Sequence, residues 1–128
     1  ARCEALFLTA GQKDTFAFRL LTGRQLPCFC LSSETALMPA WLPSFLSLIA
    51  KRVYTVMNND KTVINAQGKA INAGRQATHY FEKEYGYLPA QEPLFTYDVN
   101  DVADLVHGLK AVQAYDHLCQ VRDYYLSL

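Results

Sequence analysis

The alternation of apolar and polar positions divides the chain into a strand-rich first third and a helical remainder. Residues 6–9, 15–21 and 26–31 are short, rich in aromatic and aliphatic side chains, and alternate in polarity, as half-buried strands do. The segments between them are short and each contains a glycine, which favours tight turns. The pattern therefore predicts a small antiparallel meander of about three strands within residues 1–31.

From residue 40 onward the apolar side chains follow helical spacing. Between residues 45 and 57 they recur every three or four positions, and Pro43 suits the first turn of a helix. We expect this first helix to end at residues 58–60, whose asparagines and aspartate are poor continuations of a helix.

A second, long helix is predicted from about Lys61 to Tyr85. Asp60 can cap its start, and Gly86 is a favourable residue just after its end. Residues 94–97 form a possible short strand, and the apolar spacing over residues 98–125 predicts a third, long helix.

These elements together predict an α+β fold, in which the N-terminal meander packs against three helices, the second and third long. With 128 residues, 51% of them apolar and 19% charged, the chain has the size and composition of one globular domain. We therefore expect a single domain over residues 1–128, strand-rich in 1–31 and helical in 40–128.

A repeated heptad lies in the middle of the second predicted helix. The sequence INAQGKA at residues 64–70 is followed directly by INAGRQA at 71–77. On a helix, Ala66, Ala70 and Gly74 would form a row of small residues at intervals of four. Such a row lets another backbone approach closely. We therefore predict a close-packing helix face, whose partner is either another helix of this chain or a second copy.

The same predicted helix carries a stripe of amides and cations without a carboxylate. Lysine and arginine supply charge, while asparagine and glutamine supply directional donors, so the stripe suits phosphate or acidic groups. The alternative is an ordinary solvated helix face. The stripe consists of Asn65, Lys69, Asn72, Arg75, Gln76, His79 and Lys83.

Charge is unevenly distributed although the net charge is zero. Residues 51–79 carry five basic and one acidic side chain, and residues 80–128 carry three basic and eight acidic ones. A basic middle and an acidic end could pair across a two-fold axis. Seven of the eight tyrosines also lie in residues 80–128, and tyrosine is enriched at interfaces. Both observations favour a homodimer.

The cysteine content indicates reduced thiols and a cytoplasmic location. Cys3, Cys28, Cys30 and Cys119 are too few and too scattered for a small disulfide-stapled domain. A zinc site usually draws its ligands from two close pairs, and only Cys28 and Cys30 are close together. We therefore predict no metal and no other cofactor.

The longest uncharged stretch does not predict a membrane span. It covers the fifteen residues 36–50 and contains two prolines, whereas a spanning helix needs about 20 apolar residues. We accordingly expect no membrane partner.

No combination of residues has the spacing of a catalytic site. Asp104 and His107 are three apart and could meet on a helix, but an isolated pair of this kind is more often structural. Phosphate-binding glycine loops and nucleophile-elbow motifs are absent from the sequence. An aromatic pocket remains an alternative, because many of the aromatic residues gather in the first 48 positions: Phe7, Phe16, Phe18, Phe29, Trp41 and Phe45.

The sequence therefore predicts a non-catalytic binding or regulatory protein that acts through helix-face contacts with a protein partner, in the first place a second copy of itself. Two alternatives stay open. One is nucleic-acid binding through the polar stripe, and the other is a small-molecule-binding protein or enzyme with an aromatic pocket. The residues show no resemblance to a known family.

Overall fold

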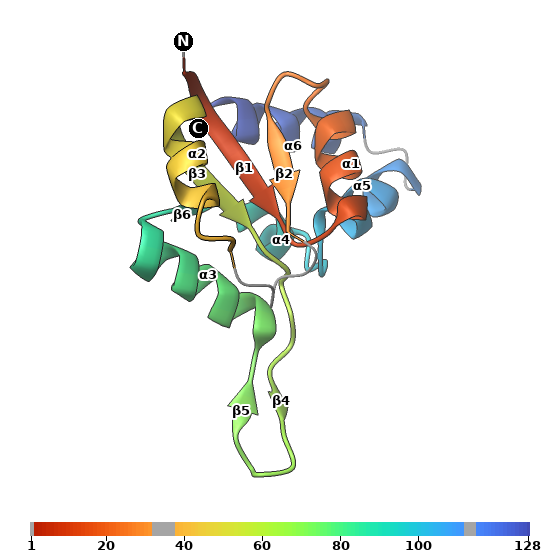
Figure 1. Cartoon of the computed structure of the whole chain (residues 1–128). Coiled ribbons are helices and arrows are strands. Elements are labelled where there is room, and N and C mark those ends of the chain that lie inside the picture. The colour runs from red at the N-terminus through yellow and green to blue at the C-terminus, as the bar shows by residue number, and fades with distance from the viewer. Residues whose placement is uncertain (1, 32–37, 112–114) are drawn as a thin grey trace.

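The computed structural model describes residues 2–31, 38–111 and 115–128 and places a sheet of four parallel strands at the centre of the molecule. The strands, in spatial order, are β2 (Cys28–Cys30), β1 (Cys3–Thr9), β3 (Ala50–Val56) and β6 (Leu88–Pro89) (Figure 1). β1 and β3 form the longest pairing, from Cys3 opposite Ala50 to Thr9 opposite Val56. The chain passes from β1 to β2 on one side and then to β3 on the other, which is the strand order of a doubly wound sheet.

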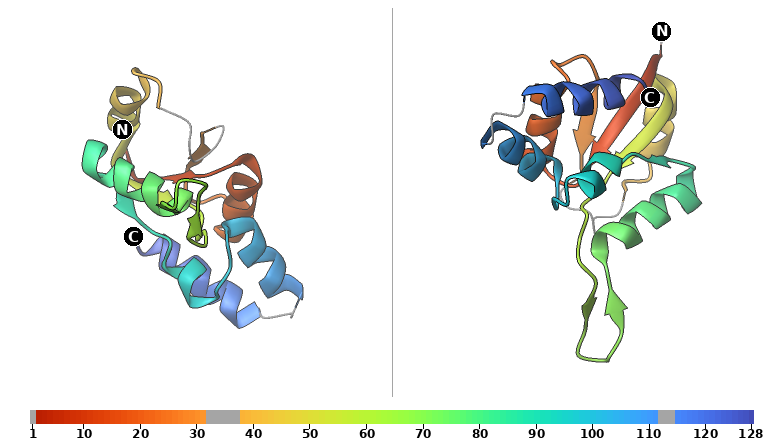
Figure 2. Two further views of the ribbon diagram at one scale, coloured as in Figure 1. Left: turned by 90° about the horizontal axis from the view of Figure 1, so that it is seen from below. Right: turned by 180° about the vertical axis from the view of Figure 1, so that it is seen from behind.

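Helices cover both faces of this sheet. One layer contains α1 (Gln12–Leu21), α4 (Glu92–Thr96), α5 (Val102–Ala111) and α6 (Tyr115–Leu126), and the other contains α2 (Leu42–Ile49) and α3 (Ala73–Tyr85) (Figure 2). Successive residues of β1 alternate between the two layers: Phe7 packs in the first core, and Leu6 and Leu8 in the second. All three are fully buried, as expected for a parallel strand covered on both faces.

In the first core, aromatic side chains of the helices pack around an aromatic residue of β1. The ring of Phe7 lies 4.8 Å from the ring of Phe18 in α1 and 5.8 Å from that of Tyr125 in α6, measured between centroids. Phe18 and Tyr125 are themselves 4.9 Å apart in an edge-to-face arrangement, a favourable geometry for aromatic pairs. These contacts join the two ends of the chain.

A two-stranded antiparallel hairpin projects from the body between β3 and α3 (Figures 1 and 2). It contains β4 (Val63–Ile64) and β5 (Ala70–Ile71), and we call residues 61–72 the arm. At its tip the Gly68 N–H donates to the Asn65 carbonyl oxygen at 3.0 Å, and Gly68 has a φ of +77°. A turn followed by a left-handed glycine is a common three-residue hairpin loop.

The fold confirms the predicted mixture of helices and strands, but the antiparallel meander is wrong. Residues 15–21 lie in α1, where Asp14, Phe18 and Leu21 are buried while Phe16 and Leu20 remain exposed. The buried positions thus follow helical spacing. The exposed apolar side chains give this segment the alternating polarity that is typical of a strand. The sequence pattern therefore did not predict the parallel topology.

Several predicted helix boundaries are also wrong. The helix predicted over residues 45–57 ends at Ile49, because 50–56 form the central strand β3. The buried Val53 and Val56 of this strand continue the apolar spacing of the preceding helix and so resemble a helix face. Residues 94–97, expected as a strand, fall largely within α4. The helix over 98–125 is replaced by α5 and α6, and residues 112–114 between them lie outside the described residues.

The predicted helix from Lys61 to Tyr85 begins only at Ala73, since residues 61–72 form the arm. Its end is confirmed: Gly86 has a φ of 70° and its N–H donates to the Glu82 carbonyl oxygen at 3.0 Å, while the Tyr87 N–H donates to the Phe81 carbonyl oxygen at 3.3 Å, as at a left-handed C-cap.

Within the described ranges, no helix is both long and apolar enough to cross a membrane.

Candidate functional site

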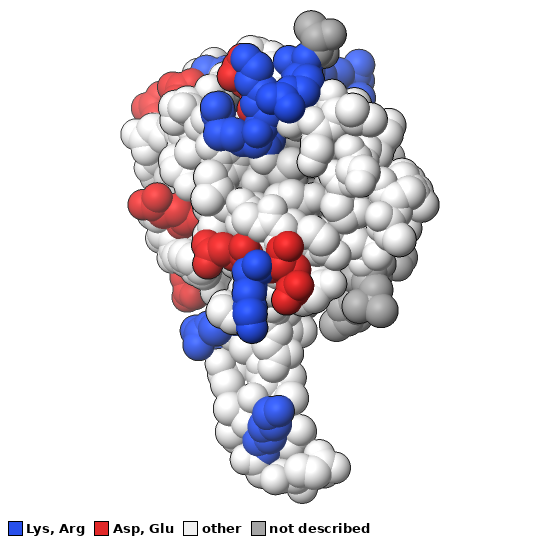
Figure 3. All heavy atoms as spheres, turned by 60° about the vertical axis from the view of Figure 1, so that its left-hand side comes forward, with Lys and Arg blue, Asp and Glu red and all other residues white. Residues whose placement is uncertain are grey.

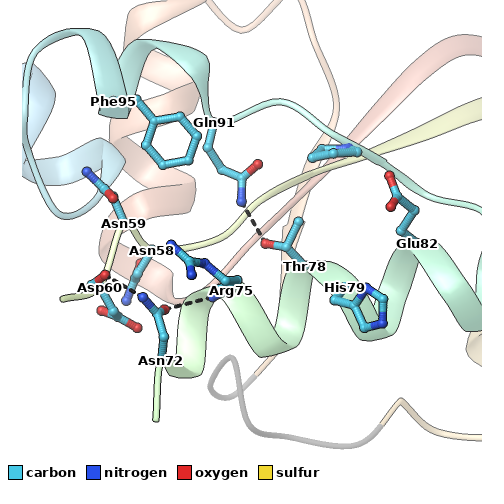
Figure 4. Close-up of a pocket in the computed structure, with 11 residues that line it drawn as sticks. Asn58, Asn59, Asp60, Asn72, Arg75, Thr78, His79, Glu82, Gln91 and Phe95 are labelled. Atoms are coloured by element: carbon cyan, nitrogen blue, oxygen red, sulfur yellow. Dashed lines mark hydrogen bonds between the residues drawn. The ribbon is translucent and has the colours of Figure 1, made fainter. Parts of the chain in front are cut away.

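A cleft of about 310 Å³ lies beyond the carboxyl ends of β3 and β6 (Figure 4). Ligands of doubly wound sheets bind at this edge, because the loops that leave the strands diverge there. One wall of the cleft is α3, and the other is formed by the loop after β3 and the segment from β6 to α4. The lining residues are Asn58, Asn59, Asp60, Asn72, Arg75, Thr78, His79, Glu82, Pro89, Gln91 and Phe95.

Asp60 and Asn72 join the loop after β3 to the start of α3. The Gly74 N–H donates to Asp60 Oδ2 at 2.8 Å, and Asn72 Nδ2 donates to the Asp60 carbonyl oxygen at 2.8 Å. Asn72 is also the N-cap of α3, since its Oδ1 accepts from the Arg75 N–H at 2.9 Å. The first turn of α3 is therefore held in a fixed position against the loop.

Gly74 is required at this junction. A Cβ at this position would overlap the backbone carbonyl of Asn58, lying 2.9 Å from its carbon, and would lie 3.1 Å from Asp60 Oδ2. The repeated heptad predicts that some backbone approaches this region closely, and the approaching group is the loop after β3 of the same chain. Close packing at Gly74 thus positions the cleft.

The opposite wall is tied to α3 through a buried amide. Gln91, just after β6, is buried and donates from Nε2 to Thr78 Oγ1 at 2.6 Å. Thr78 in turn donates to the Gly74 carbonyl oxygen at 2.9 Å. Buried polar groups are nearly always hydrogen-bonded. These two hydrogen bonds hold the segment after β6 against α3 and so fix the width of the cleft.

Arg75 is the cation of the cleft. It forms no ion pair with any residue that the structure describes, and its side chain extends from α3 towards the loop after β3 (Figure 4). The carboxylates of Asp60 and Glu82 also line the cleft, but the former already accepts from the Gly74 N–H. Arg75 is therefore available to an incoming anion.

Phe95 gives the cleft an apolar surface. Its ring is 59% exposed and faces the cleft from α4, with Pro89 also in the lining (Figure 4). An exposed aromatic ring and a cation in one lining offer a ligand both stacking and charge.

Only part of the predicted stripe meets at this cleft. Asn72, Arg75 and His79 line it, whereas the remaining members lie elsewhere: Asn65 and Lys69 on the arm, and Gln76 and Lys83 on α3 outside the lining. The prediction of one continuous helix face is wrong, because the arm interrupts the helix.

The predicted row of small residues is not a helix face either. Ala66 and Ala70 belong to the arm, and only Gly74 belongs to α3. The two asparagines of the repeat nevertheless have related local roles. Asn65 Oδ1 accepts from the Gln67 and Lys69 N–H groups at the arm tip, as Asn72 does from Arg75 at the helix start.

The sequence matches no protein-family model and no curated protein, and the structure matches no solved structure.

The cysteines do not assemble into a metal site within the described part of the chain. That part holds no group of three or more histidine, cysteine, aspartate or glutamate side chains placed to bind an ion. Burial raises the pKa of Cys28 to about 12, so its thiol is protonated at neutral pH and is a poor ligand or nucleophile. Asp104 and His107 lie on α5, and no hydrogen bond joins them.

A buried carboxyl lies outside the cleft, at the start of α1. Asp14 is 5% exposed and its Oδ1 accepts from the Ala103 N–H at 3.1 Å, in the first turn of α5. The pKa of Asp14 is raised to about 6, chiefly by burial and also by the neighbouring Asp101, against the opposing effect of the Ala103 hydrogen bond.

Eight of the eleven residues that line the cleft were not predicted from the sequence. Five of them show no motif spacing in the sequence, because the fold brings together the loop after β3, helix α3 and the segment from β6 to α4. These residues are Asn58, Asn59, Thr78, Gln91 and Phe95. A signal exists in retrospect: two asparagines and an aspartate follow directly after the apolar run 53–57, where a buried parallel strand ends at a ligand-binding edge.

Proposed function

We propose that the protein is a non-catalytic binding protein whose cleft holds a phosphorylated ligand that contains a planar ring, as a nucleotide does. The observation that carries this proposal is Arg75, a cation without an ion pair among the described residues, placed in the same cleft as the exposed ring of Phe95.

The remaining lining residues support this ligand class. Arginine binds phosphate through paired N–H donors, and the ring of Phe95 offers a face on which a base can stack. Asn58 and Asn59 also line the cleft. A binding rather than catalytic role is favoured because the described lining residues include no hydrogen-bonded pair of nucleophile and base.

Self-association through a helix face remains a prediction, but the row of small residues that suggested it does not form such a face. The uneven charge of the chain still supports a homodimer. The cleft is the stronger basis for a proposed function, because its hydrogen-bond donors, its cation and its aromatic ring line one site.

Isothermal titration calorimetry with adenosine monophosphate, adenosine and inorganic phosphate tests the proposal. We expect saturable binding of the monophosphate and weaker binding of the other two probes. Arg75→Gln should weaken monophosphate binding about 10- to 100-fold, because a hydrogen bond to a charged group contributes about 1.5–3 kcal/mol. Arg19→Gln, which removes an arginine from α1, is the matched control and should leave binding unchanged.

Phe95→Ala should weaken both adenosine and its monophosphate while leaving phosphate binding unaffected, because a stacked base contributes about 1–3 kcal/mol. Monophosphate binding that is absent, or equally strong in the Arg75→Gln variant, would contradict the proposed function.

A further inference from the structure

We infer that the ligand is a single strand of nucleic acid, with one nucleotide in the cleft and the adjoining backbone along the arm. This inference rests on the proposed function of the cleft and extends it, because it names the polymer to which the bound nucleotide belongs. Its basis is the charge, the exposure and the position of the arm.

The arm carries only cationic and neutral side chains. Lys61 and Lys69 lie on it, Arg75 follows just beyond its base, and residues 61–79 contain no aspartate or glutamate. Neither lysine forms an ion pair with a described residue. Figure 3 shows basic and no acidic side chains on the visible face of the arm. In a chain of zero net charge, this local excess favours an anionic partner.

The arm and the cleft form one continuous surface. Asp60 and Asn72 stand at the base of the arm and also line the cleft, and their hydrogen bond fixes one to the other. The six residues of each side of the arm can extend roughly 20 Å at about 3.3 Å per residue. A polymer bound in the cleft would therefore continue over several of its units along the arm.

Hydrogen bonds hold the arm at its tip and at its base, but its apolar side chains are exposed. Its tip is closed by the Asn65 hydrogen bonds and its base by Asn72, yet Val63 is 58% and Ile64 is 68% exposed. An isolated hairpin is marginally stable in water, so a partner that contacts these side chains would stabilise it. Sugars and bases offer apolar surface beside the phosphates that Lys61 and Lys69 would contact.

A single strand fits better than a duplex because of Phe95. Stacking on an aromatic ring requires a base that is not stacked between neighbouring bases. Sites for single strands combine such rings with a groove of basic side chains. In a duplex the base would first have to leave the helical stack. The ring at one end of the basic arm therefore selects an unpaired strand.

The test is fluorescence anisotropy with labelled oligonucleotides of one, three, six and twelve nucleotides, as single strands and as duplexes, over a range of salt concentrations. We expect affinity to rise with length up to the span of the arm and to fall with salt. The double variant Lys61→Gln/Lys69→Gln should lower the salt slope by about 1.4, at roughly 0.7 for each single-strand phosphate contact. It should leave mononucleotide affinity unchanged.

The double variant Lys13→Gln/Lys110→Gln is the matched control, because it removes the same charge from α1 and α5 on the opposite layer and should not change the slope. An equal effect of both double variants would overturn the inference, since binding would then follow overall charge. Duplexes that bind more tightly than single strands would also overturn it.

The outcomes separate this inference from the function on which it rests. If mononucleotides bind but longer strands bind no more tightly, the inference fails and the proposed function stands. If nothing binds, both fail. A Val63→Ser/Ile64→Ser variant that dissociates a dimer in native mass spectrometry while strand binding is unchanged would show that the arm contacts protein, and would also overturn the inference.

Discussion

Replacing Asp14 with asparagine should make the protein more stable at neutral pH. In the folded state the pKa of this carboxyl is about 6, against 3.8 as its ordinary value, chiefly because the group is buried. The folded protein therefore binds the proton more tightly than the unfolded chain does. Between about pH 4 and pH 6 the folded state holds more protons, so stability falls as pH rises through this window and is constant above it.

The magnitude follows from the two pKa values. Their difference corresponds to about 3 kcal/mol, at 1.36 kcal/mol for each pH unit, and this is the destabilisation that ionised Asp14 contributes at pH 8. Asparagine cannot ionise, yet its Oδ1 can still accept from the Ala103 N–H and its amide can donate to Asp101. We therefore expect Asp14→Asn to raise the free energy of unfolding by about 3 kcal/mol at pH 8 and by almost nothing at pH 4.

Urea unfolding followed by far-ultraviolet circular dichroism at pH 4, 5, 6 and 8 measures this difference. Asp98→Asn, at an exposed position with a positive φ that asparagine tolerates, is the control for removal of a carboxylate and should not reproduce the pH dependence. If the two stability curves of Asp14→Asn and the native chain run parallel across this range, or if the variant is less stable at pH 8, the reasoning about burial is refuted.

Two further predictions concern the close approach at α3 and the half-buried thiol of Cys28. Gly74→Ala should destabilise the fold by about 1–3 kcal/mol in urea unfolding, since overpacking costs this much. Gly108→Ala, at a helical position with nothing within 4 Å of the added carbon, should stabilise it by about 0.5–1 kcal/mol; equal effects would contradict the packing at α3. Cys28, with its pKa of about 12, should resist iodoacetamide at pH 8 and react after unfolding in urea, as peptide mass spectrometry can show. Rapid modification in the folded chain would mean that the pKa of Cys28 is not raised.

The sequence predicted those features that depend on local chemistry. Gly86 ends α3 because a left-handed residue without a Cβ is favoured there, and Pro43 lies in the first turn of α2. The cations and amides of the stripe include three of the residues that line the cleft. Such signals can be read from the sequence because each needs only a few neighbouring residues.

The features that the sequence did not predict depend on tertiary structure. The two halves of the heptad repeat share four of seven residues, yet the first lies in the arm and the second leads into α3, because Gly68 adopts a positive φ while Gly74 packs against a backbone carbonyl. Similarly, the buried Val53 and Val56 of strand β3 continue the three- and four-residue spacing of the apolar residues in the helix before it. Neither distinction is visible in hydrophobic periodicity.

The hydrogen bond between Asp60 and Asn72 has a consequence for how the molecule can vary. The chain leaves the body at Asp60 and returns to it at Asn72, and the 2.8 Å hydrogen bond between these residues makes the segment 61–71 a closed insertion. The entropy of closing such a loop changes only slowly with its length. The arm can therefore be lengthened, shortened or exchanged, while the cleft and the sheet keep their geometry.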